Sequence, residues 1–208
     1  MTYLFSIVFV IIAAPTVALS QAADRQGVQQ EKNAAAPKNS ADDRGAGLVL
    51  QAEEGERWVR RYANFRPDGT MGEFPPFILK VDPLNGGSKD LVMGMEDIPP
   101  GGSIPLHKHV HCDEILFVHR GEAVATLNGH ATPVRTGGTV FIPSGVWITF
   151  KNTGQEPLSL VFIFSKPGFE QYLREGSVRE GEKVIPFSAE ELTALRHKHE
   201  WHTVYKNP

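Results

Sequence analysis

The chain has 208 residues, which is enough for one domain with a hydrophobic core and additional tails. Hydrophobic residues make up 41% of it and charged residues 22%, and the formal net charge is -3, so electrostatics give no reason to expect a nucleic-acid partner. The 20 glycines and 15 prolines favour short strands joined by tight turns over a helix bundle. We therefore predict an all-β fold.

The first 22 residues have the pattern of an export signal. An apolar run extends from Leu4 to Ala14, a proline follows it, and small residues suited to a cleavage site come next. The run is shorter than the roughly 20 residues that a membrane-spanning helix needs. We predict a signal peptide over residues 1–22, a periplasmic or secreted protein, and no stable membrane span after processing. An uncleaved membrane anchor is the alternative.

Residues 23–47 differ in composition from the rest of the chain. They contain no Ile, Leu, Phe, Trp or Tyr, while Ala, Gln, Asp, Asn and Lys dominate. Such a segment has little apolar surface to offset the entropy lost on ordering. We predict a flexible linker here, with the folded domain over residues 48–165.

Between residues 48 and 165, short segments rich in β-branched and aromatic residues alternate with turn signals. Successive examples are PFILKVD, DLVMGMED, SIPLHKH, DEILFVHRG, EAVATLNG, TVFIPSG, VWITFKN and LSLVFIFS. This pattern predicts a sandwich or barrel of short antiparallel strands. The pair Asn128 and Gly129 predicts a type I′ hairpin turn, because both residue types tolerate the positive φ angles of that turn.

Three histidines alternate in the segment LHKHVHCDE, and two acidic residues follow them. Alternate side chains of a strand share a face, so His107 and His109 can bind one metal ion together. Neutral imidazole is a common metal ligand, and a carboxylate adds negative charge. Glu114 has the opposite parity, so it joins the histidines only if the chain bends between Val110 and Asp113.

The stretch from Gly101 to Gly121 resembles the first sequence motif of the cupin superfamily, with His107, His109 and Glu114 at its ligand positions. The resemblance implies a single jelly-roll-like β-barrel over residues 48–165. It also implies a divalent metal ion bound by these three side chains.

Downstream, the chain resembles the second cupin motif with one departure. The motif's glycine, proline, glycine and asparagine positions are occupied by Gly137, Pro143, Gly145 and Asn152. Ile148 stands where metal-binding cupins carry a further histidine ligand. We interpret Pro143 and Gly145 as turn residues and expect Asn152 to bond to the backbone.

Three hypotheses account for Ile148. In the first, His107, His109 and Glu114 alone hold Fe, Mn, Ni or Zn and leave coordination positions open. In the second, His111 is a replacement ligand. In the third, no metal binds, and Glu114 works with the histidines in general acid and base catalysis or in ligand binding. Clustered ionisable groups inside a small barrel favour the first, because a bound metal offsets their desolvation.

Strand alternation also predicts a substrate pocket. If Ile148 faces inward, Val146 and Phe150 do too, and they give the site an apolar wall. Trp147 and Thr149 then face outward. Such a pocket suits a substrate with an apolar body and a few oxygen atoms.

Residues 166–208 predict a C-terminal helical tail. Ser188 followed by Glu191 is a capping box, and it begins the segment SAEELTALRHKHEWHTVY. Among other candidate ligands, we interpret Cys112 as a small buried side chain and expect His119 and His130 at the surface. The histidines of the tail are interpreted as a solvated helix end; they are His197, His199 and His202.

Together these patterns predict an exported metal-binding cupin that acts on a small organic molecule. Among the reactions that the resemblance implies, we favour a dioxygenase-type oxidation, with Glu114 as a catalytic residue. The alternatives are a non-catalytic protein that binds a small molecule or a sugar, and a metal-free isomerase or lyase. A homodimer is implied by the resemblance alone.

Overall fold

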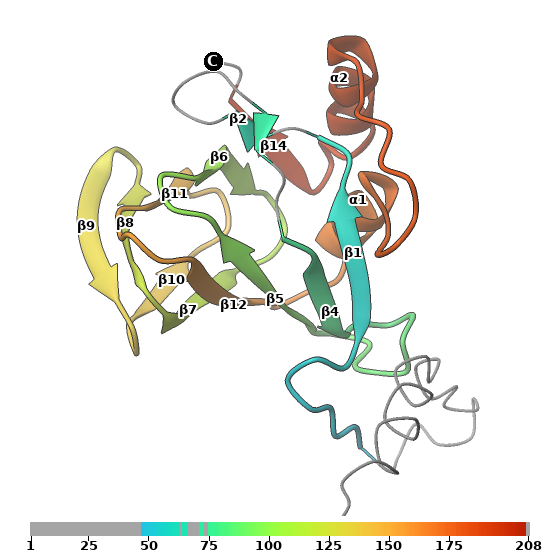
Figure 1. Ribbon diagram of the computed structural model, residues 1–208, viewed down its shortest axis with the longest axis horizontal. Coiled ribbons are helices and arrows are strands. Elements are labelled where there is room, and N and C mark those ends of the chain that lie inside the picture. The colour runs from blue at the N-terminus through green and yellow to red at the C-terminus, as the bar shows by residue number, and fades with distance from the viewer. Residues whose placement is uncertain (1–46, 63, 66–70, 73–74, 207–208) are drawn as a thin grey trace, which may run out of the picture. The chain divides into compact units, whose positions relative to one another are not determined.

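The computed structural model describes residues 47–62, 64–65, 71–72 and 75–206. The predicted signal peptide and almost all of the predicted linker lie outside these residues. Within them, two antiparallel β-sheets account for most of the regular structure, and two short helices follow near the C-terminus (Figure 1). The all-β prediction with a helical tail is therefore confirmed. No helix of the described part is long and apolar enough to cross a membrane.

The larger sheet has seven strands, and all of its pairings are antiparallel. In spatial order its strands are β10 (Thr139–Ile142), β7 (Glu114–Arg120), β12 (Leu158–Phe164), β5 (Val92–Ile98), β4 (Phe77–Val81), β1 (Glu56–Arg60) and β13 (Ser177–Arg179).

The smaller sheet has five strands and carries the two histidines of interest. In spatial order its strands are β14 (Thr203–Tyr205), β6 (Ser103–His109), β11 (Ile148–Asn152), β8 (Glu122–Leu127) and β9 (His130–Arg135). A separate pair of short strands is formed by β2 (Asn64–Phe65) and β3 (Met71–Gly72).

One hydrophobic core receives side chains from both sheets. Buried and less buried residues alternate along β5 and β7, as expected for strands with one face toward a core. Leu116 and Phe162 enter this core from the larger sheet, and Ile148 and Phe150 enter it from the smaller one. Burial of this apolar face is what fixes the strand register, because a slip of one residue would turn every core side chain toward solvent.

The hairpin between β8 and β9 confirms the predicted turn. Asn128 and Gly129 have φ angles of 48° and 87°, and the flanking residues Leu127 and His130 are paired. Both central residues are therefore in the left-handed region that a type I′ turn requires.

The predicted helical tail contains two helices, α1 (Phe169–Glu175) and α2 (Ala189–Lys198), and also two strands that were not predicted from the sequence. The capping box of Ser188 and Glu191 is present at the start of α2. The chain does not stay helical beyond Lys198: it turns and forms β14, which pairs with β6. The last strand of the tail thus lies directly beside the histidine-bearing strand (Figure 1).

Candidate metal site

The chain passes from the smaller sheet to the larger one between His109 and Glu114, two of the predicted ligands. β6 ends at His109 in the smaller sheet, and β7 begins at Glu114 in the larger one. The bend between them is held by backbone hydrogen bonds from Val110 to His202 (2.9 Å) and from Gly145 to His109 (2.6 Å). This crossing brings the Glu114 carboxylate to the histidines despite its opposite parity along the sequence.

His107, His109 and Glu114 meet as a buried group. Ligand atoms of all three lie within 4.8 Å of one another, and their exposed fractions are only 4%, 2% and 5%. The reserve candidate, His111, is exposed and does not belong to this group. The structure therefore assembles the three side chains named from the sequence and leaves His111 outside.

The ring orientation of His107 is fixed by the backbone. Its Nδ1 lies 2.8 Å from the carbonyl oxygen of Pro105. A carbonyl only accepts hydrogen bonds, so Nδ1 carries the proton and the lone pair is on Nε2. The ring also stacks on Tyr205, with 5.5 Å between centroids. Such contacts hold an imidazole ready to bind a metal through Nε2.

His109 is oriented by the tail. Its Nδ1 lies 2.9 Å from the hydroxyl of Thr203, on β14. Its Nε2 lies 3.5 Å from Oε2 of Glu114, and neither of these buried atoms has a hydrogen-bond partner. A native buried polar atom without a partner calls for an explanation, and an ion between them is one.

Burial sets the protonation of the group. It lowers the pKa of His107 to about 4, with a further lowering by neighbouring His109, and lowers the pKa of His109 to about 3. Burial also raises the pKa of Glu114 to about 7. The imidazoles are therefore neutral at pH 7, and His109 and Glu114 are not an ion pair despite their proximity.

The group fits a divalent metal ion on these grounds. Two neutral imidazoles and a carboxylate are a ligand set used for Fe(II), Mn(II), Ni(II) and Zn(II). A cation would supply the partner that His109 Nε2 and Glu114 Oε2 lack and would favour the ionised carboxylate. His107, His109 and Glu114 are the residues that would hold it.

A cavity of about 50 Å³ adjoins this group. His107 and Glu114 line one part of it, and apolar side chains line another; these are Phe162, Phe164, Phe169 and Leu173. Since one water molecule needs roughly 10–15 Å³ of such space, the cavity suits a ligand of few atoms.

The structure places the predicted pocket residues in or against the hydrophobic core, on or just before the strand next to β6. Ile148 pairs with His107 across β11 and β6, and both Ile148 and Phe150 are fully buried in the hydrophobic core, with Val146 packed against it. None of the three lines the cavity. The phenylalanines of β12 and α1 provide the apolar wall of this cavity.

Two arginines that the sequence analysis did not single out also line the cavity. Arg60 forms a buried ion pair with Glu96. Arg196, on α2, lies over the ring of Tyr205 at 4.5 Å, forms no ion pair within the described ranges, and has a buried Nε without a hydrogen-bond partner. Among the described residues that line the cavity, Arg196 is therefore a cation without an acidic partner.

The prediction of a solvated helix end is wrong for two of the three tail histidines. His197 is exposed, but His199 and His202 have exposed fractions of 3% and 1%. The helix ends before His199, and pairing of β14 with β6 carries His202 into the interior. The run HTVY, rich in β-branched and aromatic residues, was the available signal for this strand.

The predictions for four further residues are confirmed. Cys112 is a buried free thiol, and burial raises its pKa to about 12. Asn152 donates from its side-chain amide to the backbone carbonyls of Ile98 and Glu156. His119 and His130 are both exposed.

Comparison with known proteins agrees with this architecture. Residues 94–164 match the family model described as a cupin domain. The chain is 30% identical to the oxalate-binding protein of Thermotoga maritima over 57% of its own length and 94% of that protein. The chain belongs to the cupin superfamily. The chain is also 34% identical to protein SchB of Streptomyces halstedii, over 39% of this chain and 59% of SchB.

Similar chains are also found among solved structures. One is a predicted oxalate decarboxylase from Thermotoga maritima, with a TM-score of 0.48 and 25% identity, covering 58% of this chain and 100% of that one.

Proposed function

We propose that this cupin binds a divalent metal ion through His107, His109 and Glu114 and takes a small carboxylate ligand in the adjoining cavity. The observation that carries the proposal is the pair of buried atoms without partners, Nε2 of His109 and Oε2 of Glu114, 3.5 Å apart. A metal ion bound there would act as a Lewis acid with open coordination positions.

Arg196 supports the choice of a carboxylate. Its guanidinium lines the same cavity as His107 and Glu114, and a guanidinium binds a carboxylate through two parallel hydrogen bonds. A small dicarboxylate such as oxalate fits this arrangement, with Arg196 holding one end and the metal-binding side chains facing the other. The oxalate-binding relative, 94% of whose length the chain covers, supports the same ligand class.

The remaining cavity residues would determine the polarity and charge around such a ligand. The phenylalanines of β12 and α1 exclude water from one side, which strengthens the electrostatic contacts of the bound anion. The Arg60–Glu96 ion pair is neutral as a unit and shapes the wall without attracting a second anion. These residues orient and desolvate a small acid.

A metal-free role for Glu114 is the second candidate. The raised pKa of about 7 places its carboxyl where it can hold or release a proton near neutral pH. In that case Glu114 would be a general acid or base toward a ligand in the cavity. Oxidation by dioxygen stays a prediction of the sequence, and oxygen consumption by the Fe(II)-loaded protein tests it.

We also propose that the protein works outside the cytoplasm. The support is the apolar run near the N-terminus followed by small residues, which is typical of an export signal. Mass spectrometry of the protein purified from its native cells tests the proposal: a mature chain that begins near residue 23 is expected, and an intact Met1 would contradict it.

Metal analysis of the purified protein tests the site. We expect one equivalent of metal in the wild type and in His130→Ala, which removes an exposed histidine of β9. We expect the uptake of Fe(II) and Mn(II) to be lost in His107→Ala and Glu114→Gln. A folded wild type that takes up no Fe, Mn, Ni or Zn on reconstitution would contradict metal binding.

Calorimetric titration with oxalate tests the ligand class. Arg196→Gln should weaken binding to the metal-loaded protein roughly 10- to 100-fold, from the roughly 1.5–3 kcal/mol that a hydrogen bond to a charged group contributes. Arg135→Gln, at an exposed position of β9, is the matched control. Equal affinities for the two variants would exclude Arg196 from the site.

A further inference from the structure

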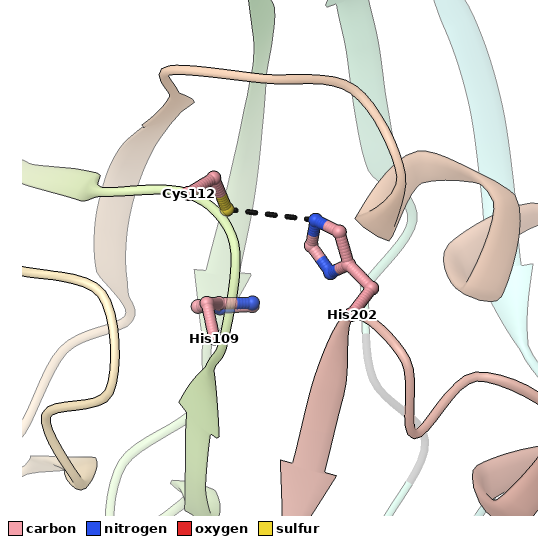
Figure 2. A group of neighbouring side chains, drawn as sticks. All are labelled: His109, Cys112 and His202. Carbon is pink, nitrogen blue, oxygen red and sulfur yellow. Dashed lines mark hydrogen bonds between the residues drawn. The ribbon is translucent and has the colours of Figure 1, made fainter.

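A second group of potential metal ligands lies beside the first and shares His109 with it. His109, Cys112 and His202 each present a ligand atom within 4.8 Å of the other two. Their exposed fractions are 2%, 3% and 1%. Figure 2 shows the three side chains converging from the end of β6, the bend that follows it, and the residue that precedes β14.

We infer that His109, Cys112 and His202 form a second metal site, selective for Zn²⁺ or Cu⁺. A thiolate is the soft ligand that these ions prefer, whereas Fe(II) and Mn(II) suit the carboxylate-containing set. Two imidazoles and a thiolate supply three protein ligands, one short of the four that Zn²⁺ takes. Binding either ion displaces the proton of the Cys112 thiol.

The Thr203 hydroxyl orients both imidazoles of this site. It lies 2.9 Å from Nδ1 of His109 and 2.8 Å from Nδ1 of His202. With Nδ1 engaged in each ring, the nitrogen left to bind a metal is Nε2. For His202 this atom faces the sulfur of Cys112 at 3.5 Å, as the dashed line in Figure 2 shows. Partners of this kind on the second ring nitrogen are typical of metal-binding histidines.

The space occupied by His202 depends on Gly168. A Cβ atom at residue 168 would lie 2.2 Å from Cδ2 and 2.8 Å from Nε2 of His202. Phe169 stacks on the same ring, with 6.1 Å between centroids and 15° between planes. The His202 ring is therefore held between the start of α1 and Cys112, which leaves it little freedom to turn away.

This step rests on the proposed function: if His107, His109 and Glu114 bind a metal ion, the two sites compete for His109. His109 has one ring nitrogen outside its bond to Thr203, and that nitrogen binds one ion at a time. An ion at Cys112 and His202 therefore takes His109 from the set with His107 and Glu114. The identity of the metal decides which set is filled, so Zn²⁺ or Cu⁺ would inhibit loading with Fe(II) or Mn(II).

Optical spectroscopy of the full chain with Co²⁺ in place of Zn²⁺ tests the site. A thiolate ligand gives Co²⁺ a near-ultraviolet charge-transfer band, which imidazoles and carboxylates do not. We expect the band in the wild type and in His111→Ala, which removes an exposed histidine next to Cys112. It should vanish in Cys112→Ser and weaken at least tenfold in His202→Asn. A wild type without the band, or a band that survives Cys112→Ser, would overturn the inference.

Mn(II) uptake, measured together with the Co²⁺ spectra, distinguishes failure of the second site from failure of the first. His107→Ala and Glu114→Gln should abolish uptake of Mn(II) and leave the thiolate band intact. Mn(II) uptake that is unaffected by these two variants would refute the first site alone.

X-ray absorption by the Zn²⁺-loaded wild type needs no variant. One sulfur at about 2.3 Å from zinc is expected, and a shell of nitrogen and oxygen atoms alone would contradict the site.

Discussion

Strands β6 and β14 lie side by side in one sheet, yet they contribute to the site in different ways. β6 brings His107 and His109, which share a face because they are two residues apart. β14 is paired with it in a register that places Thr203 opposite His109 and Tyr205 opposite His107. The motif-bearing strand supplies ligands, and the tail strand supplies the groups that orient them.

The ligands of the first site and the tail groups that orient them therefore come from distant parts of the chain. His107 and Glu114 are seven residues apart, whereas 94 residues separate His109 from the Thr203 hydroxyl that it contacts. A change in the tail should therefore alter metal binding without touching a ligand of the first site. Four variants, three in the tail and one at the ligand Glu114, separate the two contributions, and the variant expected to lose most stability comes first.

The largest effect is expected from Gly168→Ala. Gly168 has a φ angle of 144°, and an added Cβ would collide with His202. Backbone strain and overpacking together should lower the free energy of unfolding by about 3–5 kcal/mol, measured by urea denaturation.

Gly181→Ala is the matched control for Gly168→Ala, because Gly181 has a φ angle of 90° and open space around its Cβ position. It should lose about 1–3 kcal/mol from strain alone. Equal losses in the two variants would show that the contact with His202 contributes nothing.

Glu114→Gln should change how the stability of the metal-free protein depends on pH. Burial raises the pKa of this carboxyl from 4.5 to about 7, so its contribution is fully present below pH 4.5 and is lost as pH rises through 7. Between pH 4.5 and 7 the free energy of unfolding of the variant should therefore rise relative to that of the wild type. The rise should reach up to about 3 kcal/mol, at roughly 1.4 kcal/mol per pKa unit.

Urea denaturation in the presence of a chelator, from pH 4.5 to 8, measures this difference. His107 acts in the opposite direction, since its contribution is present above pH 6.5 and lost toward pH 4. The Glu114 charge raises the pKa of His107, so Glu114→Gln also removes that effect. Glu122→Gln, at an exposed position, is the control and should follow the wild type. A constant difference between Glu114→Gln and the wild type would contradict the raised pKa.

Thr203→Val should weaken metal binding to the first site by roughly 10- to 100-fold, the usual effect of losing a group that orients a ligand. The isosteric change removes the hydroxyl next to Nδ1 of His109 and retains the packing of β14. Titration with Mn(II) measures the affinity, and Thr132→Val on β9 is the control. Unchanged affinity would show that the tail does not orient His109.

The smallest effect is expected from Ser188→Ala, which removes the capping box of α2. The loss should be about 1 kcal/mol, and it should appear as faster hydrogen exchange of the amides of α2, with Thr132→Ala as the control. Because α2 carries Arg196, oxalate affinity should fall slightly as well. Unchanged exchange would mean that packing alone holds this helix.

Much of the first site was predictable because its determinants are local. Alternation along a strand placed His107 and His109 on one face, and the opposite parity of Glu114 required the bend that the structure has between the two sheets. The capping box and the Asn128–Gly129 turn were also predictable, since each depends on residues close together in the chain.

The tail was harder to predict because its role depends on pairing. His199 and His202 look like the end of a solvated helix until β14 is placed beside β6. Likewise, alternation correctly predicted that Ile148 and Phe150 are buried, but it carried no information about which residues line the cavity.

The strand-rich class, the ligand residue types and their spacing could be predicted from the sequence, because hydrophobic alternation and local turn chemistry act over a few residues. That Thr203, Arg196 and His202 belong to this region follows from the folded structure alone. Contacts across nearly a hundred residues depend on which strands pair and in what register, and that is settled by burial of the whole core.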